Sequence, residues 1–113
     1  MKFRRGDIVA CALPGDFGGR PRPALVVQSD LVNPTHATVA VCPITTHLQD
    51  AEHFRIPVRP GARSGLRADS QVMVDKLTAV RVSRVGERLG SLDEQEIEAV
   101  DQALLLWLGL GRE

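Results

Sequence analysis

The 113-residue sequence is poor in aromatic residues and has no long apolar run. It contains no tyrosine, three phenylalanines and one tryptophan. A module that binds RNA by stacking its bases needs exposed rings, and only Phe17 and Phe54 could serve as such platforms. The longest apolar run, residues 103–111, is well short of the roughly 20 residues that span a bilayer. The first nine residues turn polar where a signal peptide needs an apolar segment, so we expect neither export nor membrane insertion.

Cysteine and histidine are also scarce. Cys11 and Cys42 lie inside apolar runs and form no C-x-x-C pair. His36, His47 and His53 have no spacing typical of metal ligands, so we expect no metal site and no cofactor. We interpret the two cysteines as reduced core residues of a cytoplasmic protein, with a disulfide between them as the alternative.

The chain has no net charge, but its charges are segregated. Residues 1–92 carry 13 basic and 8 acidic side chains, which gives +5, whereas residues 93–113 carry 1 basic and 6 acidic side chains, which gives −5. The body of the protein can therefore attract an anion although the net charge is zero.

Seven short segments are rich in Val, Ile, Leu or Ala and are bounded by Gly, Pro, Asn, Asp or Ser. Segments of this kind are typical of short strands in a curved sheet or barrel. They are residues 7–13, 24–28, 38–43, 54–58, 71–75, 78–82 and 86–89. The chain has no internal repeat and no low-complexity linker, so we expect residues 1–113 to form one domain with one core.

The acidic end of the chain has the pattern of a helix. Ser91 with Glu94, or Asp93 with Glu96, can form a capping box. Apolar residues then recur at helical spacing: Ile97, Val100, Leu104, Trp107 and Leu108. We expect a helix over about residues 92–110 beside a barrel of about residues 1–91. The predicted fold class is therefore mainly β with one C-terminal helix.

The end of this helix is apolar on more than one face. The residues concerned are Leu104, Leu105, Leu106, Trp107, Leu108 and Leu110. One small barrel can cover only one face of a helix, so we expect a homodimer in which a second subunit covers another.

The segment GGRPRPALVVQSD, residues 18–30, contains two arginines that each precede a proline. Proline pushes the preceding residue toward extended geometry, so Arg20 and Arg22 are held in narrow conformations at the entry of a strand. This arrangement suits a charge that is aimed before its ligand arrives. The alternative is an ordinary strand start at Pro23 with solvated arginines.

Five segments taken in order resemble the MazF/PemK family of toxin endoribonucleases from bacterial type II toxin–antitoxin systems. They are RRGDIV (residues 4–9), RPALVVQSD (22–30), VCPITTH (41–47), SQVMVDKLTAV (70–80) and RVGERLGSLDEQEI (84–97). The resemblance implies a small SH3-like barrel with a C-terminal helix, the MazF/CcdB-like toxin fold. It also implies a homodimer that inhibits translation and growth and is held in check by an antitoxin with an acidic C-terminal segment.

The same resemblance implies a reaction and a site. Family members cleave single-stranded RNA at selected sequences without a metal, by attack of the ribose 2′-OH on the adjacent phosphate. The products are a 2′,3′-cyclic phosphate and a 5′-OH end. Arg22 matches the catalytic arginine of the family and Thr45 matches its threonine. An arginine fork and a hydroxyl donor suit a phosphate that gains negative charge, although Thr45 could also be a simple turn former at a strand end.

Further site residues are candidates. A base must take the proton from the 2′-OH, and arginine is a poor one, so we consider Asp75 and His47 for this role. Asp75 could instead form a surface ion pair with Lys76 or Arg81, and His47 could be an idle loop residue. For RNA binding we consider four residues: Arg20, Phe17, Thr46 and Lys76. The loop of residues 14–21 is shorter than in many relatives, so their sequence preference does not transfer to this chain.

Two other functions are compatible with the same fold. A CcdB-like gyrase poison acts without catalysis and has a tryptophan near the end of its last helix, which Trp107 matches loosely. A barrel that binds RNA or protein without chemistry is the third possibility. The scarcity of aromatic residues disfavours it.

Overall fold

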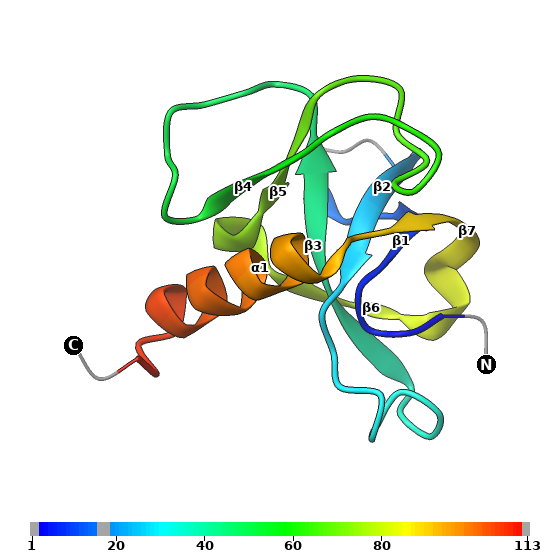
Figure 1. Ribbon diagram of the computed structural model, residues 1–113. Coiled ribbons are helices and arrows are strands. Elements are labelled where there is room, and N and C mark those ends of the chain that lie inside the picture. The colour runs from blue at the N-terminus through cyan, green and yellow to red at the C-terminus, as the bar shows by residue number, and fades with distance from the viewer. Residues whose placement is uncertain (1–2, 16–18, 112–113) are drawn as a thin grey trace.

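The computed structural model describes residues 3–15 and 19–111, which form a strongly curved antiparallel sheet of seven strands with one long helix beside it (Figure 1). The elements in chain order are β1 (Asp7–Ala12), β2 (Pro21–Val26), β3 (Thr38–Thr45), β4 (Arg55–Val58), β5 (Ser70–Met73), β6 (Thr78–Arg81), β7 (Val85–Ser91) and α1 (Glu94–Trp107). Single turns of 3-10 helix, η2 (Val74–Lys76) and η3 (Val82–Arg84), follow β5 and β6. Each of the seven predicted strands and the predicted helix is present, with shifted ends.

Strand β3 organises the sheet because it pairs with three other strands. Along one edge it pairs with β2. Along the other edge its first half pairs with β6 and its last two residues, Ile44 and Thr45, pair with β5. The full strand order is β4-β5-β3-β2-β1-β7 with β6 also on β3. This change of partner bends the sheet around β3 and brings the end of that strand to the junction of two sheet halves.

Both faces of the central strands are buried. Successive side chains of a strand point to opposite faces, so Ile8 packs into one apolar cluster and Val9 into another. The first cluster lies under α1 and includes Val100 and Ala103 of that helix. The second cluster is built around β1, β2, β3 and Val85. The single core predicted from the length is therefore two clusters on either side of one sheet, which explains why the strands read as continuous apolar runs.

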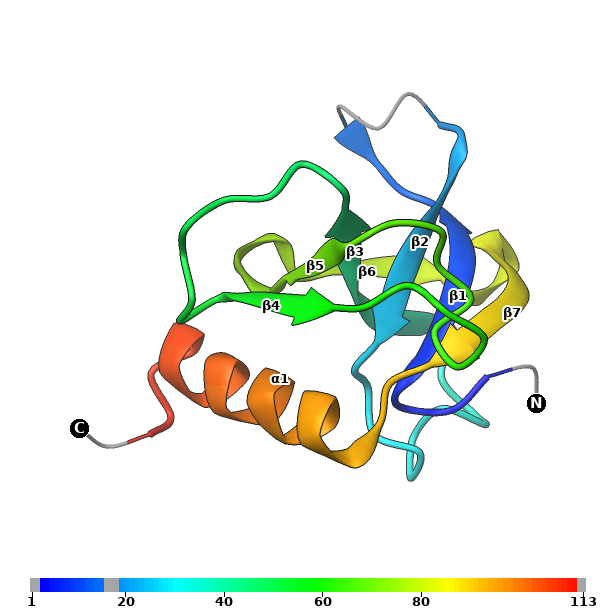
Figure 2. The same cartoon turned by 45° about the horizontal axis from the view of Figure 1, so that its top comes forward.

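Helix α1 begins at a complete capping box. The Asp93 carboxylate accepts the backbone N–H of Glu96 at 2.8 Å, and the Glu96 carboxylate accepts the backbone N–H of Asp93 at 2.9 Å. This selects the second of the two predicted capping boxes, because Ser91 still belongs to β7. The helix lies alongside β4 (Figure 2). No helix in residues 3–15 and 19–111 is long and apolar enough to cross a bilayer.

Two element ends differ from the prediction and affect the site. Strand β2 begins at Pro21, so Arg22 lies within the strand rather than before it. Strand β5 ends at Met73, whereas the sequence predicts a strand up to residue 75. Arg55 is the first residue of β4 and pairs with Met73, so the ladder between β4 and β5 ends there, with one further bond from the Val74 N–H to the Phe54 carbonyl, and the chain then turns. Asp75 therefore sits on the 3-10 turn η2.

Both cysteines are buried free thiols. Cys42 belongs to the cluster under α1 and Cys11 to the cluster on the opposite face of the sheet, so the disulfide alternative is wrong. Burial raises the pKa of the Cys42 thiol to about 12, and the nearby Asp75 carboxylate acts in the same direction. Burial also raises the pKa of Cys11.

Candidate active site

A cavity of about 430 Å³ opens where the start of β2 meets the end of β3. Its third wall is the segment of residues 59–69 between β4 and β5, which reaches across the sheet toward β7 (Figures 1 and 2). The lining residues are Arg22, Pro23, Ile44, Thr45, Thr46, Gly65, Leu66, Arg67, Ala68, Ser70 and Leu89. Of the predicted site residues, the cavity thus brings together Arg22, Thr45 and Thr46.

Arg22 is positioned by the pairing of β2 with its two neighbours. Pro21 and Pro23 flank it within the strand, and β1 pairs with β2 along this whole stretch. The pairing of β2 with β3 ends at Ala24, opposite Pro43. Continuing the same register by two residues brings Arg22 opposite Thr45 on the same face of the sheet. The missing ladder leaves room for the cavity beside these two side chains.

Thr45 is the last residue of β3, and its hydroxyl is oriented by the next turn of the chain. Its Oγ1 atom accepts the backbone N–H of His47 at 3.0 Å. A hydroxyl has one donor and two acceptor positions, so the proton of Thr45 remains free for a ligand. The His47 side chain is exposed and does not line the cavity.

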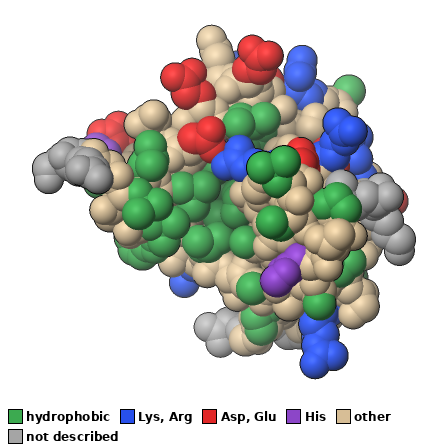
Figure 3. All heavy atoms as spheres, turned by 90° about the horizontal axis from the view of Figure 1, so that it is seen from below, with side chains coloured by type: hydrophobic (Ala, Val, Ile, Leu, Met, Phe, Trp, Pro, Cys, Tyr) green, Lys and Arg blue, Asp and Glu red, His purple; other side chains and the backbone are tan. Residues whose placement is uncertain are grey.

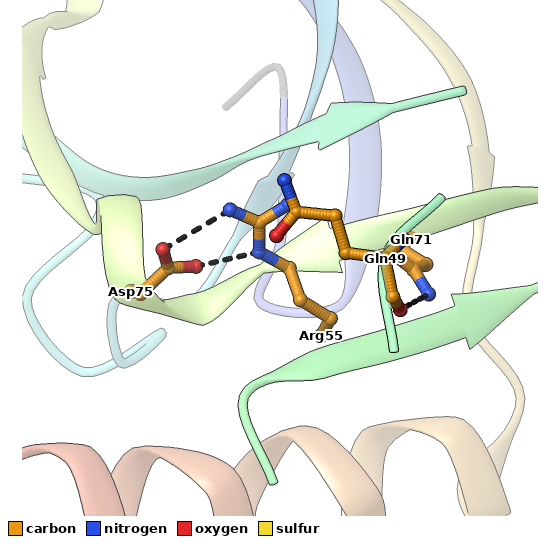
Figure 4. A network of polar contacts seen from close by, with 4 residues as sticks. All are labelled: Gln49, Arg55, Gln71 and Asp75. Atoms are coloured by element: carbon orange, nitrogen blue, oxygen red, sulfur yellow. Dashed lines mark hydrogen bonds and ion pairs between the residues drawn. The ribbon is translucent and has the colours of Figure 1, made fainter. Parts of the chain in front are cut away.

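A reciprocal pair of amide hydrogen bonds holds the segment that follows Thr45 against β5. The Gln71 side chain accepts the backbone N–H of Gln49 at 3.0 Å and donates to the backbone carbonyl of Gln49 at 2.9 Å (Figure 4). Gln71 is also the residue of β5 that pairs with Thr45. Gln71 therefore holds Thr45 through strand pairing and the backbone of Gln49 through its side chain.

The charged residues that line the cavity are all positive. Arg22 and Arg67 supply two guanidinium groups, and Thr45, Thr46 and Ser70 supply three hydroxyls. The described lining includes no Asp or Glu. Two like charges in one cavity repel one another unless an anion lies between them. The arrangement is therefore suited to bind a negatively charged group.

Three other arginines of the described chain, Arg5, Arg55 and Arg88, have carboxylate partners. Arg5 pairs with Asp101 at 2.6 Å and Arg88 with Asp7 at 3.0 Å. No ion pair involves Arg22 or Arg67 within residues 3–15 and 19–111. The two unpaired guanidinium groups thus face the same cavity.

Asp75 forms an ion pair with Arg55 outside the cavity lining. Its two oxygens accept from Nε and an Nη atom of Arg55 at 2.8 and 3.1 Å (Figure 4). The Arg55 side chain is 7% exposed and that of Asp75 is 16% exposed. The partner is thus neither Lys76 nor Arg81, the two surface residues considered from the sequence. Asp75 is not among the residues that line the cavity.

The remaining predicted RNA-binding residues lie outside the cavity lining or outside the described chain. Arg20 is exposed just before β2, and Lys76 is exposed on η2. Neither of them lines the cavity. Phe17 lies outside the described residues. Phe54, the other aromatic platform considered from the sequence, packs against the core and against the Trp107 ring at a centroid distance of 5.3 Å.

Sequence reasoning missed Arg67. The segment 59–69 carries three arginines in RPGARSGLRAD, and this local excess of positive charge is a signal that could have drawn attention to it. The sequence does not show which of the three reaches the cavity, because that depends on how the segment packs on β7. Within the described chain, no three His, Cys, Asp or Glu side chains are grouped so that they could hold a metal ion.

A second surface feature lies at the end of α1. Figure 3 shows a broad apolar area on the face seen from below, on the side where the helix ends. Leu104 packs against the core, whereas the remaining large apolar residues of this end are exposed. They are Leu105, Leu106, Trp107, Leu108 and Leu110. This area is the predicted dimer surface.

Comparison with known proteins gives concordant results. The family model described as PemK-like, MazF-like toxin of type II toxin–antitoxin system matches residues 4–108. The chain is 42% identical over 108 residues to the probable endoribonuclease MazF of Mycolicibacterium smegmatis, covering 96% of this chain and 98% of that protein. It is 30% identical over 116 residues to endoribonuclease EndoA of Bacillus subtilis, covering 97% of each. The solved structure of the Mycobacterium tuberculosis toxin MazF-mt6 is similar with a TM-score of 0.79 and 26% identity, covering 91% of this chain and 96% of that one. This structural match confirms the predicted toxin fold.

Proposed function

Because the chain belongs to the family of PemK-like, MazF-like toxins of type II toxin–antitoxin systems, we propose that its cavity around Arg22 and Thr45 is where it cuts RNA. The protein is an endoribonuclease, as its relatives of 42% and 30% identity are named. The observation that carries the proposed site is the charge of the cavity. Unpaired guanidinium groups and hydroxyls line it, and its described residues include no carboxylate. A phosphodiester of RNA is an anion that suits such a surface.

The proposed reaction is an attack of the ribose 2′-OH on the adjacent phosphate of single-stranded RNA. A bond forms between the 2′-oxygen and phosphorus, and the bond from phosphorus to the 5′-oxygen breaks. The 2′-OH loses its proton and the leaving 5′-oxygen gains one, which gives a 2′,3′-cyclic phosphate and a 5′-OH end. DNA lacks the attacking hydroxyl and is not cut. The reaction needs no metal, because the charges of the cavity are supplied by side chains.

Arg22 and Thr45 have separate roles in this reaction. Negative charge builds up on the phosphoryl oxygens as the 2′-oxygen attacks. The planar fork of Arg22, aimed by the prolines on either side, stabilises that charge. Thr45 donates its free proton to the same group, because its oxygen already accepts from His47. Arg20 and Lys76 are exposed but do not line the cavity, so their proposed role is to bind phosphates further along the RNA.

Proton transfer is the part of the reaction for which the sequence suggested Asp75 and His47. Both oxygens of Asp75 bind Arg55, and the His47 side chain lies outside the cavity lining. We therefore assign Asp75 a role in positioning the strands and assign neither residue the role of base.

Cleavage of end-labelled RNA in the presence of a chelator tests this proposal. The wild-type protein should generate cyclic-phosphate and 5′-OH ends. Arg22→Ala should lower the cleavage rate by about 100- to 1,000-fold, as expected for loss of one preorganised donor, with an unchanged circular dichroism spectrum. Arg20→Ala is the matched control, because it removes the same charge two residues away and should cost less than tenfold. Wild-type cleavage by Arg22→Ala would refute the proposed site. Absence of cleavage by the wild-type protein would favour the gyrase-poison or binding-barrel alternatives.

The proposed assembly is a homodimer formed through the end of α1. Its support is the exposed apolar group from Leu105 to Leu110, since a patch of this size on a small domain is typical of an interface. Sedimentation at micromolar concentration should give twice the monomer mass, and a monomer would rule out this interface.

The proposed partner is the cognate antitoxin of the toxin–antitoxin pair. An acidic C-terminal segment of the antitoxin would lie across the basic surface and occupy ground that RNA needs. Cleavage should then stop as the antitoxin is titrated, and binding should weaken as salt rises. Full cleavage activity in a complex saturated with antitoxin would contradict a shared surface. The proposed location is the cytoplasm, as expected from the sequence.

A further inference from the structure

The segment of residues 59–69 is built to hold a fixed conformation. The backbone N–H of Gly65 donates to the carbonyl of Gly61 at 2.9 Å, and the N–H of Gly61 donates to the carbonyl of Leu66 at 3.1 Å. The hydroxyl of Ser64, a buried residue, donates to the Arg59 carbonyl at 2.8 Å. These bonds close the segment on itself, so it is an ordered part of the cavity wall.

The same segment is seated on β7. The backbone N–H of Ser91 donates to the carbonyl of Arg63 at 2.8 Å. A Cβ atom on Gly65 would lie 1.9 Å from the Leu89 carbonyl oxygen, and one on Gly90 would lie 2.3 Å from the Arg63 carbonyl oxygen. Only two glycines allow the backbones to approach this closely. The position of the segment relative to the cavity is therefore set by β7.

Arg67 lies in this segment between residues whose positions are fixed. Leu66 on one side is buried in the cluster under α1. On the other side, the hydroxyl of Ser70, whose residue is 3% exposed, donates to the Ala68 carbonyl at 2.9 Å. The backbone is thus held before and after Arg67, and its exposed side chain lines the cavity together with Arg22.

Arg22 and Arg67 approach the cavity from different walls. Arg22 comes from β2 and shares its face with Thr45, whereas Arg67 comes from the opposing segment. A single-stranded RNA that presents its reacting phosphate to Arg22 and Thr45 must carry a further phosphate one nucleotide away. No carboxylate in the described chain forms an ion pair with Arg67, so its guanidinium is available for that second phosphate.

We propose that Arg67 is a substrate-positioning residue that binds the phosphate next to the one that is cut. The inference rests on the proposed function, since it takes RNA as the ligand of the cavity. Arg67 binds this phosphate equally in the ground state and in the transition state. Its loss therefore raises KM and leaves kcat nearly unchanged.

The test compares Arg67→Ala with Arg63→Ala. Arg63 lies in the same segment and is also exposed, but it does not line the cavity, so its replacement removes the same charge without touching the site. We expect Arg67→Ala to raise KM about tenfold, as for one lost charge-assisted hydrogen bond, with kcat within about twofold. Arg67→Lys should recover part of the loss, because it keeps the charge but not the fork. Arg63→Ala should behave like the wild type.

Binding to an RNA with a single 2′-deoxy residue at the mapped cleavage position gives a readout independent of cleavage. Each phosphate contact to a single strand contributes about 0.7 to the slope of log Kd against log salt. That slope should fall by about this amount in Arg67→Ala and stay unchanged in Arg63→Ala. A neutral methylphosphonate at the neighbouring phosphate should weaken binding to the wild type and have no further effect on Arg67→Ala.

The outcomes separate this inference from the proposed function. If the wild-type protein does not cut RNA, or Arg22→Ala cuts normally, the proposed function itself fails. If the wild type cuts RNA but Arg67→Ala keeps its KM and its salt slope, this inference alone is wrong. A fall in kcat as large as that of Arg22→Ala would also overturn it, because Arg67 would then act on the phosphate that is cut.

Discussion

Replacing Asp75 by asparagine separates a structural role of this residue from a chemical one. The pair with Arg55 is largely withdrawn from water, with side-chain exposures of 7% and 16%, and it is bidentate at 2.8 and 3.1 Å. The change leaves the Arg55 charge buried without a counter-charge and turns an amide N–H₂ toward it. Breaking a buried pair in this way costs about 3–5 kcal/mol. Because Asp75 retains some contact with water, we expect a cost at or just below the lower limit of this range, about 2–3 kcal/mol.

The measurement is thermal unfolding followed by circular dichroism at a fixed protein concentration, since dimerisation makes the melting temperature concentration-dependent. A loss of this size should lower the melting temperature by about 10 °C in a domain of this length. The double variant Arg55→Met with Asp75→Leu should recover most of the stability, because apolar residues of similar volume can replace a buried ion pair. Asp101→Asn is the control. Its pair with Arg5 has side-chain exposures of 30% and 45%, so it should cost less than about 1 kcal/mol.

Cleavage by the same variants decides between the two roles. Asp75 does not line the cavity, so the double variant should retain the kcat of the wild type within about threefold at a temperature where both are folded. An Asp75→Asn protein that melts like the wild type but cuts RNA more than about 100-fold more slowly would refute this reasoning. Such a result would return Asp75 to the role of proton acceptor.

Two further predictions concern the packing of segment 59–69 on β7 and the two buried thiols. Gly65→Ala should lower both the melting temperature and the affinity for RNA, because its Cβ would meet the Leu89 carbonyl oxygen at 1.9 Å. Gly19 has the same φ of +72° but no atoms close to where a Cβ would lie. Gly19→Ala should therefore show only the smaller cost of the backbone conformation. Equal melting temperatures of the two variants would contradict the close packing of segment 59–69 on β7. Cys42 and Cys11 should resist alkylation in the native protein at about pH 8.5 and react once it is unfolded, because burial keeps the thiols protonated. Rapid alkylation of the native protein would contradict this burial. Because folding raises the pKa of Cys42 from 9.0 to about 12, only the unfolded thiol ionises just above pH 9. The free energy of unfolding should therefore fall as pH rises above about 9.

The elements that the sequence predicts well are those encoded by neighbouring residues. Apolar runs between Gly, Pro and Asp mark the strands, and Asp93 with Glu96 marks the start of α1. The family motifs likewise direct attention to Arg22 and Thr45, which the register of β2 and β3 then brings opposite each other. These signals are local, or they lie on strands whose pairing follows from the fold.

Contacts between distant segments could not be predicted in the same way. Asp75 has Lys76 beside it in the sequence, yet its partner is Arg55, 20 positions earlier on a neighbouring strand. Arg67 reaches the cavity because of the close approach of Gly65 to β7. A glycine in a loop does not by itself indicate which backbone it will touch. Strand ends shifted for a related reason, since β5 stops opposite Arg55, where its antiparallel partner β4 begins.

The packing of segment 59–69 on β7 has a consequence for the order in which the cavity is completed as the chain is synthesised. Arg22, Thr45 and Arg67 are all synthesised before β7, but the contacts that position the segment need Leu89, and also Gly90 and Ser91. A ribosome-bound chain in which these residues have not yet emerged therefore lacks the third wall of the cavity, which is segment 59–69. The proposed RNA site therefore lacks its final geometry until all seven strands have left the exit tunnel. A toxin built in this way completes its cavity only after β7 has been made, although Arg22, Thr45 and Arg67 come earlier in the chain.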